Sequence, residues 1–294
     1  MPMTMACIVG TEIQRQIESG RLAVQRLGRR ATPFGDSGEL FQCNDGPTGF
    51  YLLVRHGAGL AKPAPWKIND RANLYALKDV GAQCVLSWGP GGAVTHNFAV
   101  GDLVILSDLI DRTRQRPRTF FENSPLGYLR QFPVFCPTLR RVAGEALHGL
   151  RLSYHGAAAA AVSEGPRLET PAEVRMLATA GAEIVTHHFA PEAFLAKELQ
   201  LCYAAVCYVV NYAETGSCHR PFSAGDLFGG LTQQSDGQRL AAVLAAMGTV
   251  NRQIAAALAA ASGACECDKT QAANIQAYGL NSDWRTWFKT EQRS

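Results

Sequence analysis

The run LCYAAVCYVVNY, from Leu201 to Tyr212, most constrains what this chain can fold into. It carries no charged side chain and stays apolar on both faces until Asn211. A strand that is apolar on both faces belongs in the middle of a sheet, with helices covering it on each side. The run therefore predicts a central buried strand, and it places Asn211 at the carboxyl end of that strand.

Around this strand, short apolar segments alternate with helical patterns from about residue 50 to residue 260. Residues 49–54 (GFYLLV) read as a strand, residues 70–79 have the apolar spacing of a helix, and residues 82–88 form a second strand. The same order of helix, Gly-Ala and strand returns at 171–179 and 182–188. This repeat predicts two equivalent positions in the sheet.

The alternation continues without a long linker rich in Pro, Gly or Ser, which favours one α/β domain over residues 1–262. Residues 236–262 are rich in alanine and predict a long amphipathic helix. Residues 263–294 show no clear core pattern and are interpreted as a C-terminal tail.

The composition narrows the class of protein. A net charge of +3, with no run of Lys and Arg dense enough to resemble a binding surface for a phosphate backbone, does not suggest a nucleic-acid partner. The nine cysteines are irregularly spaced, as expected for reduced core thiols in a cytoplasmic protein. No signal peptide and no apolar run of membrane-spanning length is evident, so no membrane partner is expected.

No metal site is expected from the sequence. Cys265 and Cys267 form a single CxC without a second pair of cysteines nearby in the sequence. His187 and His188 are neighbours on a predicted strand, so their side chains point to opposite faces and cannot easily chelate one ion.

The segment SEGPRLETPAE, from Ser163 to Glu173, connects the apolar residues 156–162 to the start of a helix. Thr170 is a good N-cap and is followed by proline at the first helical position. Glu164, Arg167 and Glu169 then lie on a loop between two rigid elements, where α/β proteins usually keep binding groups. The alternative is a solvated helix N-terminus whose acidic residues only suit the helix dipole.

Polar groups follow four of the predicted strands, an arrangement typical of a small-molecule site. They are Arg55 with His56, the SWGPGG turn of residues 87–92, His187 with His188, and Asn211. Arg55 and His56 match an anion, although a strand-end salt bridge fits them equally well. The Asn211 amide offers a donor and an acceptor to a heterocycle, or simply forms a turn.

In seven segments, the chain resembles the trimeric purine nucleoside phosphorylases, especially their methylthioadenosine phosphorylase branch. The resemblance runs from about residue 8 to residue 247. It is carried in order by TPFGDSGEL (32–40), VRHG (54–57), NDRANLYALKDVGAQCVLSWGPGGAV (69–94), VGDLVILSDLIDRT (100–113), FCPTLR (135–140), SEGPRLETPAE and APEAFLAKE (190–198).

The resemblance implies a single α/β domain with a mixed, partly barrelled central sheet surrounded by helices, assembled as a homotrimer. It also implies phosphorolysis: phosphate attacks the anomeric carbon of a purine nucleoside as the base leaves, with inorganic phosphate as co-substrate and no cofactor. By position, Asn211 is the catalytic contact to the purine N7 edge and Glu169 contacts the N1 side. Leu168 stands where an aromatic side chain usually packs. The pair of Asn211 and Glu169 resembles the base-binding pair of enzymes for 6-oxopurines, such as those acting on inosine, guanosine or methylthioinosine.

The resemblance assigns the remaining site residues by position. Phosphate would be held by Thr11, Arg55, His56, Gly89 and His188, with His56 also counted as catalytic. Glu12 replaces a usual glycine beside Thr11, and Trp88 and His188 are bulkier than the family's usual residues there. The sugar would contact His187, Trp88 and Phe228, with Phe222, His219 and, across a subunit interface, Tyr128 as further candidates for its 5′ end.

Two alternatives to phosphorolysis stay open in the sequence. In the first, Trp88 and His188 fill the phosphate space and water, polarised by His188 or Glu12, attacks in a nucleoside hydrolase. In the second, the chain binds a nucleoside without turning it over.

Overall fold

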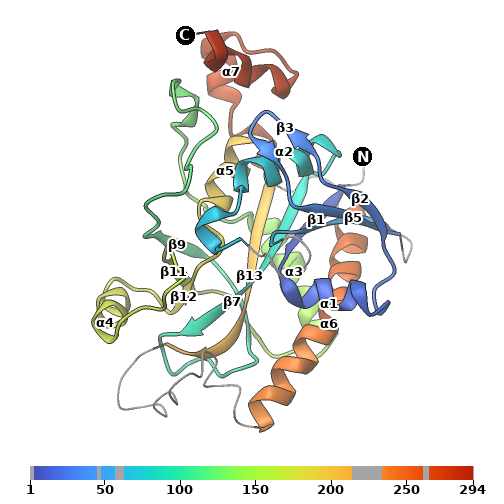
Figure 1. Ribbon diagram of the computed structural model, residues 1–294, viewed down its shortest axis with the longest axis vertical. Helices are drawn as coiled ribbons and strands as arrows, with labels where there is room; N and C mark the ends of the chain where they lie inside the picture. The colour runs from blue at the N-terminus through green and yellow to red at the C-terminus, as the bar shows by residue number, and fades with distance from the viewer. Residues whose placement is uncertain (1–2, 45–47, 57–62, 214–233, 261–264, 294) are drawn as a thin grey trace.

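A mixed sheet runs through the middle of the molecule, and helices lie on both of its faces (Figure 1). The structure is a computed structural model, and it describes residues 3–44, 48–56, 63–213, 234–260 and 265–293. Among the described strands the sheet does not close into a barrel. The predicted single-domain α/β fold with a mixed central sheet is confirmed, without full barrel closure.

The centre of the sheet is the parallel pair β7 (Cys84–Ala93) and β13 (Cys202–Tyr212). The predicted central strand is therefore confirmed, and every residue of β13 up to Asn211 is buried. The strands that extend this pair are β1 (Met5–Val9), β6 (Phe50–Val54), β5 (Glu39–Cys43) and β2 (Gln25–Gly28) beyond β7, and β8 (Leu103–Ile105) and β10 (Tyr154–His155) beyond β13.

The sheet forks at β7. The last residues of β7 also pair with β12 (Ile184–Thr186), which carries β11 (Ala159–Val162) and β9 (Asp108–Asp111). Because β12 is antiparallel to β7, the prediction of two equivalent sheet positions is wrong. The local pattern of helix, Gly-Ala and strand does not encode strand direction, which is set by long-range pairing. The end of β12 consequently lies beside Pro90 and Gly91, near the carboxyl end of β7.

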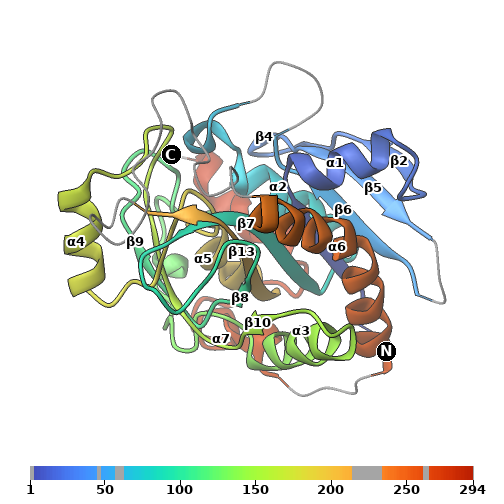
Figure 2. The ribbon, with the colours of Figure 1, turned by 90° about the horizontal axis from the view of Figure 1, so that it is seen from below.

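Helices form two layers because successive side chains of the central strands point to opposite faces. One layer holds α1 (Thr11–Glu18), α3 (Pro137–Gly149) and α6 (Gln234–Ala260), and Figure 2 shows α3 and α6 together beside the sheet. The other holds α2 (Asp70–Asp79) and α5 (Glu192–Glu198), while α4 (Pro171–Thr179) packs on the side branch. The short elements are β3 (Ala31–Thr32), β4 (Gly35–Asp36), η1 (Pro65–Lys67) and η2 (Pro125–Gly127).

By length and composition alone, residues 237–260 of α6 would suffice to cross a membrane, which the sequence analysis did not anticipate. In the fold, Val250, Ile254 and Leu258 of this helix are buried in the core under the sheet. An apolar face that packs on a sheet is also what a core helix of a globular domain presents.

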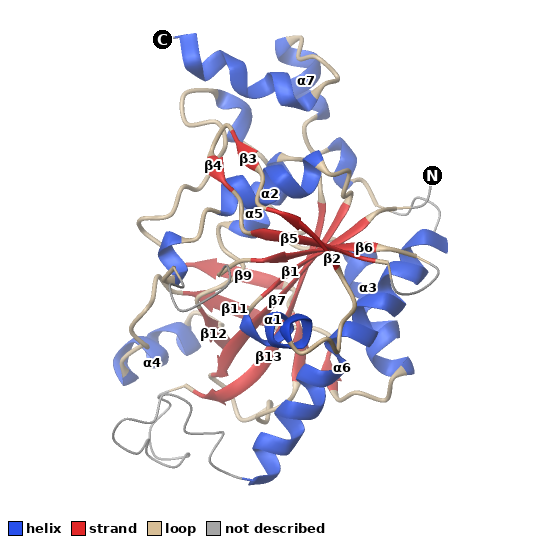
Figure 3. Cartoon of the chain, turned by 45° about the vertical axis from the view of Figure 1, so that its right-hand side comes forward, coloured by secondary structure: helices blue, strands red, loops and turns tan. Residues whose placement is uncertain are grey.

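The residues predicted to be a tail without a core pattern are folded where the structure describes them. They form η4 (Cys267–Lys269), α7 (Ala272–Tyr278) and η5 (Trp284–Arg293), seen at the top of Figure 3. Trp287 and Phe288 are buried, and the Phe288 ring stacks on Phe121 with 5.4 Å between centroids. Two aromatic side chains thus join the main core without any periodic pattern that the sequence could reveal.

Candidate active site

A cavity of about 120 Å³ lies at the fork of the sheet, where β7, β12 and β13 meet. Five of its lining residues were singled out from the sequence: Leu168, Glu169, His187, His188 and Asn211. They come from three separate segments of the chain. We call this space the fork cavity; its other lining residues are Pro90, Gly91, Gly92, Val185, Thr186, Val210, Tyr212 and Ala213.

Asn211 enters the fork cavity from a bulge near the end of β13. The pairing of β13 with β7 shifts between Val209 and Asn211, so that Asn211 lies opposite Gly92. A Cβ atom on Gly92 would come within 2.8 Å of the Asn211 Oδ1 atom. Glycine at position 92 therefore leaves the space that the Asn211 amide occupies.

The predicted SWGPGG turn is instead the body of β7. A Cβ atom on Gly91 would meet the Cys207 Sγ atom at 2.5 Å, and one on Gly89 would meet the Phe189 ring at 2.8 Å. These glycines allow neighbouring strands and loops to pack closely, which a glycine run permits as readily as it permits a turn.

Glu169 and His187 are joined by a residue that the sequence analysis did not assign to the site. The Ser163 hydroxyl donates to Glu169 Oε1 and lies 2.9 Å from His187 Nδ1. The Glu169 carboxylate is 4.0 Å from that same nitrogen. Burial lowers the pKa of His187, and the nearby Glu169 carboxylate offsets this only in part. The neutral ring and the carboxylate thus present a hydrogen-bonding edge to the cavity.

The loop that carries Glu169 is held by Arg116, which is buried and was also missed in the sequence. Its guanidinium lies 3.2 Å from Glu164 Oε1 and donates to the carbonyl oxygens of His187 and Ala190 at 2.9 and 2.8 Å. At the other end of the loop, Thr170 forms the predicted cap and makes a capping box with Glu173. The loop is thereby fixed at both ends. The only signal for Arg116 is its place in the basic run RTRQRPR.

On the far side of His188, Arg55 and His56 line a second, more open cavity of about 680 Å³. The Arg55 side chain is almost wholly buried, and its Nη atoms donate to the Trp88 carbonyl and the Ser87 hydroxyl, both at 2.7 Å. Its Nη2 atom is also 3.5 Å from Glu192. Within the described residues, the Nε atom of Arg55 has no hydrogen-bond partner. The Nε–H donor of Arg55 is therefore available to an anion.

His56 and His188 lie between the two cavities. Their ring centroids are 5.8 Å apart in an edge-to-face arrangement, and His188 also packs over Gly89. Burial lowers the pKa of His188 well below its usual value, with the Arg55 charge adding to this. The His188 ring is therefore neutral at neutral pH. It can form a hydrogen bond, but it does not supply a positive charge that would attract phosphate.

Trp88 does not enter either cavity. Its ring is buried in the core against α6, where its Nε1 atom donates to Asn251 Oδ1 at 2.9 Å. The structure therefore does not place Trp88 as a sugar contact or as a plug in the phosphate space. Successive residues of a strand face opposite sides, and the sequence alone did not say which face Trp88 takes.

The other predicted residues are more scattered. Thr11 begins α1 directly after β1, and the Glu12 carboxylate pairs with Arg15 at 3.1 Å. Tyr128 is strongly exposed on the surface. The sugar candidates Phe222, Phe228 and His219 lie outside the described residues.

Away from the fork cavity, the structure corrects the expectation that the CxC has no partners. Cys136 and Cys202 approach Cys265 and Cys267, and the four sulfur atoms lie within 4.8 Å of one another. The sequence hid this cluster because its members are separated by 63 residues or more, apart from the CxC itself.

Comparison with known proteins places the chain in a family. Residues 6–247 match the model of the Phosphorylase superfamily. The chain is 37% identical over 208 residues to a probable S-methyl-5'-thioinosine phosphorylase of Methanothermobacter thermautotrophicus, covering 70% of each chain. It is 41% identical over 169 residues to a probable 6-oxopurine nucleoside phosphorylase of Thermococcus kodakarensis, covering 55% of this chain and 63% of that protein. In this second case less than two thirds of the relative is spanned.

Solved structures agree on the fold. Methylthioadenosine phosphorylase from Schistosoma mansoni in complex with tubercidin superposes with a TM-score of 0.78 at 22% identity, over 94% of this chain and 98% of that one. The fork of the sheet is thus part of a nucleoside phosphorylase fold. The chain belongs to the phosphorylase superfamily, and the relatives it matches include proteins named as probable 6-oxopurine nucleoside and S-methyl-5'-thioinosine phosphorylases.

Proposed function

We propose that the chain is a purine nucleoside phosphorylase that cleaves the N-glycosidic bond of a 6-oxopurine nucleoside or its 5′-methylthio relative. The observation that most directly supports this proposal is that Glu169 and Asn211, far apart in the sequence, line one cavity. The names of the relatives from Thermococcus kodakarensis and Methanothermobacter thermautotrophicus support the same substrate class.

The two side chains match the edge of a 6-oxopurine. The Asn211 Nδ2 group can donate to O6, and its Oδ1 atom can accept a hydrogen bond from N7 once N7 is protonated; the Glu169 carboxylate can accept from the N1–H group. Adenine offers no hydrogen at N1 and an amino group at position 6, so both contacts would be mismatched. Glu169 keeps one oxygen for this role because Ser163 donates to the other.

In the proposed reaction a phosphate oxygen forms a bond to C1′ as the C1′–N9 bond breaks. The electron pair of that bond leaves with the purine, which takes up a proton from water, and the sugar becomes a pentose 1-phosphate. Asn211 stabilises the negative charge that develops on the base, as a preorganised donor does in other enzymes. The Arg55 Nε donor and His56, in the adjoining cavity, are the proposed phosphate contacts.

The hydrolase alternative loses its main support because the Trp88 ring lies in the core. One assay separates the three functions. The protein is incubated with inosine, guanosine, adenosine and methylthioinosine, with and without phosphate, and the sugar product is identified. Pentose 1-phosphate formed only with phosphate supports the proposal. Free pentose indicates a hydrolase, and tight binding without turnover indicates a binding protein.

We also propose that the protein acts as a homotrimer in the cytoplasm. The described cysteines form no disulfide, which suits that compartment. The exposed Tyr128 and Phe132 side chains offer apolar surface to a neighbouring copy. Light scattering coupled to size exclusion tests this assembly, and a mass of about one chain would contradict it.

A further inference from the structure

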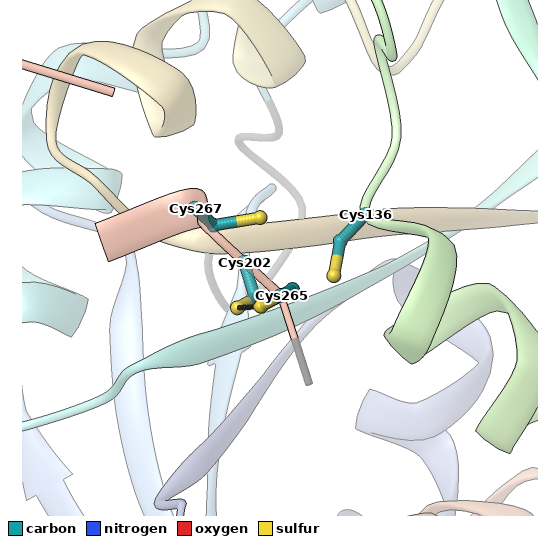
Figure 4. Close-up of side chains that lie close together, drawn as sticks. All are labelled: Cys136, Cys202, Cys265 and Cys267. Carbon is teal, nitrogen blue, oxygen red and sulfur yellow. Dashed lines mark hydrogen bonds between the residues drawn. The ribbon is translucent and has the colours of Figure 1, made fainter. Parts of the chain in front are cut away.

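Four cysteine side chains converge on one point at the end of the sheet opposite the fork cavity (Figure 4). Cys136 stands immediately before α3, Cys202 begins β13, and Cys265 and Cys267 come from the C-terminal segment. Two of the residues are buried and two are half-buried. We call these four residues the cysteine cluster.

The geometry suits one metal ion better than separate thiols. All four sulfur atoms lie within 4.8 Å of one another, and the Cys202 and Cys265 sulfurs are 3.2 Å apart. A tetrahedral zinc ion bound at about 2.3 Å from each sulfur requires sulfur atoms about 3.8 Å apart. The 3.2 Å spacing is shorter than that value and no spacing exceeds 4.8 Å, so small side-chain rotations complete the tetrahedron.

The backbone around the cluster is fixed by its own hydrogen bonds. The Cys136 amide donates to the Tyr203 carbonyl at 2.8 Å, which ties the start of α3 to β13. On the other side, the Thr270 hydroxyl donates to the Lys197 carbonyl at 2.8 Å, and the buried Gln271 amide donates to the Leu126 and Glu198 carbonyls. These bonds hold the CxC segment against α5 and β13, so the fold itself brings the four sulfur atoms together.

The surroundings also suit negatively charged sulfur and allow an ion to enter. Cys136 precedes a helix of 13 residues, whose N-terminal dipole favours an anionic ligand. Lys197 lines the same open cavity, of about 660 Å³, as three cysteines of the cluster. Four thiolates in a tetrahedron select zinc or iron among the common metals.

We propose that Cys136, Cys202, Cys265 and Cys267 bind one structural Zn²⁺ ion that fastens the C-terminal segment to the start of β13. All four positions are taken by protein ligands, as in structural rather than catalytic zinc sites. The ion would therefore contribute to folding stability and take no part in the reaction at the fork cavity.

The test uses the whole chain, purified with a non-thiol reductant and without chelators. Elemental analysis should find about one zinc ion per chain, and the Cys265→Ala/Cys267→Ala double variant should lose almost all of it. Replacing zinc with Co²⁺ should give the visible bands of tetrahedral cobalt and a sulfur-to-cobalt charge-transfer band. Cys43→Ala, which removes a buried thiol on β5 outside the cluster, is the matched control and should keep its zinc.

Other outcomes overturn the proposal. A reduced protein that takes up neither Zn²⁺ nor Co²⁺ has no such site, and equal zinc in the double variant places the metal elsewhere. Iron instead of zinc in the purified chain, or a mass two hydrogens lower for each cysteine pair, would show an iron site or disulfides. Because Cys267 is half-buried, Cys267→Ser with an unchanged circular dichroism spectrum separates metal loss from unfolding.

Discussion

The strand β13 carries a distinctive site at each end, and the two are built in different ways. At its carboxyl end, Asn211 reaches the fork cavity through a bulge opposite Gly92. At its amino end, Cys202 meets three other thiols from α3 and the C-terminal segment. One end presents hydrogen-bonding groups to the fork cavity, and the other presents four thiols to one another.

The difference shows that the two ends of one buried central strand can hold two different kinds of site. Its apolar body makes both ends rigid, so either end can hold a polar group in a fixed place. The side chains at the carboxyl end line a cavity, whereas the thiols at the amino end lie against one another. We therefore expect changes at Asn211 to affect activity first, and changes at the cysteine cluster to affect stability first.

The largest expected effect is that of Asn211→Ala. Loss of a preorganised donor to the leaving base should lower kcat/KM for inosine by about 100-fold to 1,000-fold, with little change in the melting temperature. Steady-state phosphorolysis and thermal unfolding are the measurements. Asn97→Ala, at an exposed position, is the control. If Asn211→Ala turns over inosine as fast as the wild type, Asn211 does not have the proposed role.

Next comes Glu169→Gln, which replaces the acceptor for the N1–H group by an amide. A neutral acceptor, or an NH2 group turned toward the N1–H group, should cost inosine about tenfold to a hundredfold in kcat/KM, because hydrogen bonds to charged groups are the stronger ones. Adenosine, which offers no hydrogen at N1, should be affected much less. The inosine-to-adenosine ratio is the measurement, and an unchanged ratio would mean that Glu169 does not read the base.

Gly92→Ala tests whether the bulge serves to place the amide. The added Cβ atom would come within 2.8 Å of Asn211 Oδ1, so the amide must shift. We expect about a tenfold loss of kcat/KM from misplacement of one catalytic contact. The matched control is Gly149→Ala at the end of α3, where a Cβ atom meets nothing within 4 Å. Full activity in Gly92→Ala would show that the close packing has no functional consequence.

The smallest expected effect is on the pH dependence of stability. Burial lowers the pKa of His188, so the unfolded chain binds a proton before the folded chain as the pH falls below about 6.5. Between pH 7 and pH 5 the wild type should therefore lose about 1 to 2 kcal/mol more unfolding free energy than His188→Asn. Urea unfolding at both pH values measures the difference. Parallel losses in the two proteins would indicate a solvated His188.

Much of the fold is predictable where local pattern determines it. The helices at 70–79 and 171–179, the cap at Thr170 and the central strand follow from periodicity and capping, which depend on neighbours in the sequence. The antiparallel direction of β12 and the orientation of Trp88 do not, because the first depends on pairing with β7 about 90 residues away and the second on packing against Asn251, 163 residues away. Phe288, buried against Phe121, escaped prediction for the same reason.

The sequence by itself determined the α/β class, the burial of β13, and the chemistry of the Glu169 and Asn211 side chains that line the fork cavity. These follow from hydrophobicity and side-chain chemistry, which each residue carries wherever it lies. Only the tertiary structure decided that Trp88 lies in the core, that Ser163 and Arg116 support the site, and that four distant cysteines meet at one point. Such meetings arise from packing between segments far apart in the chain, and no local pattern records them.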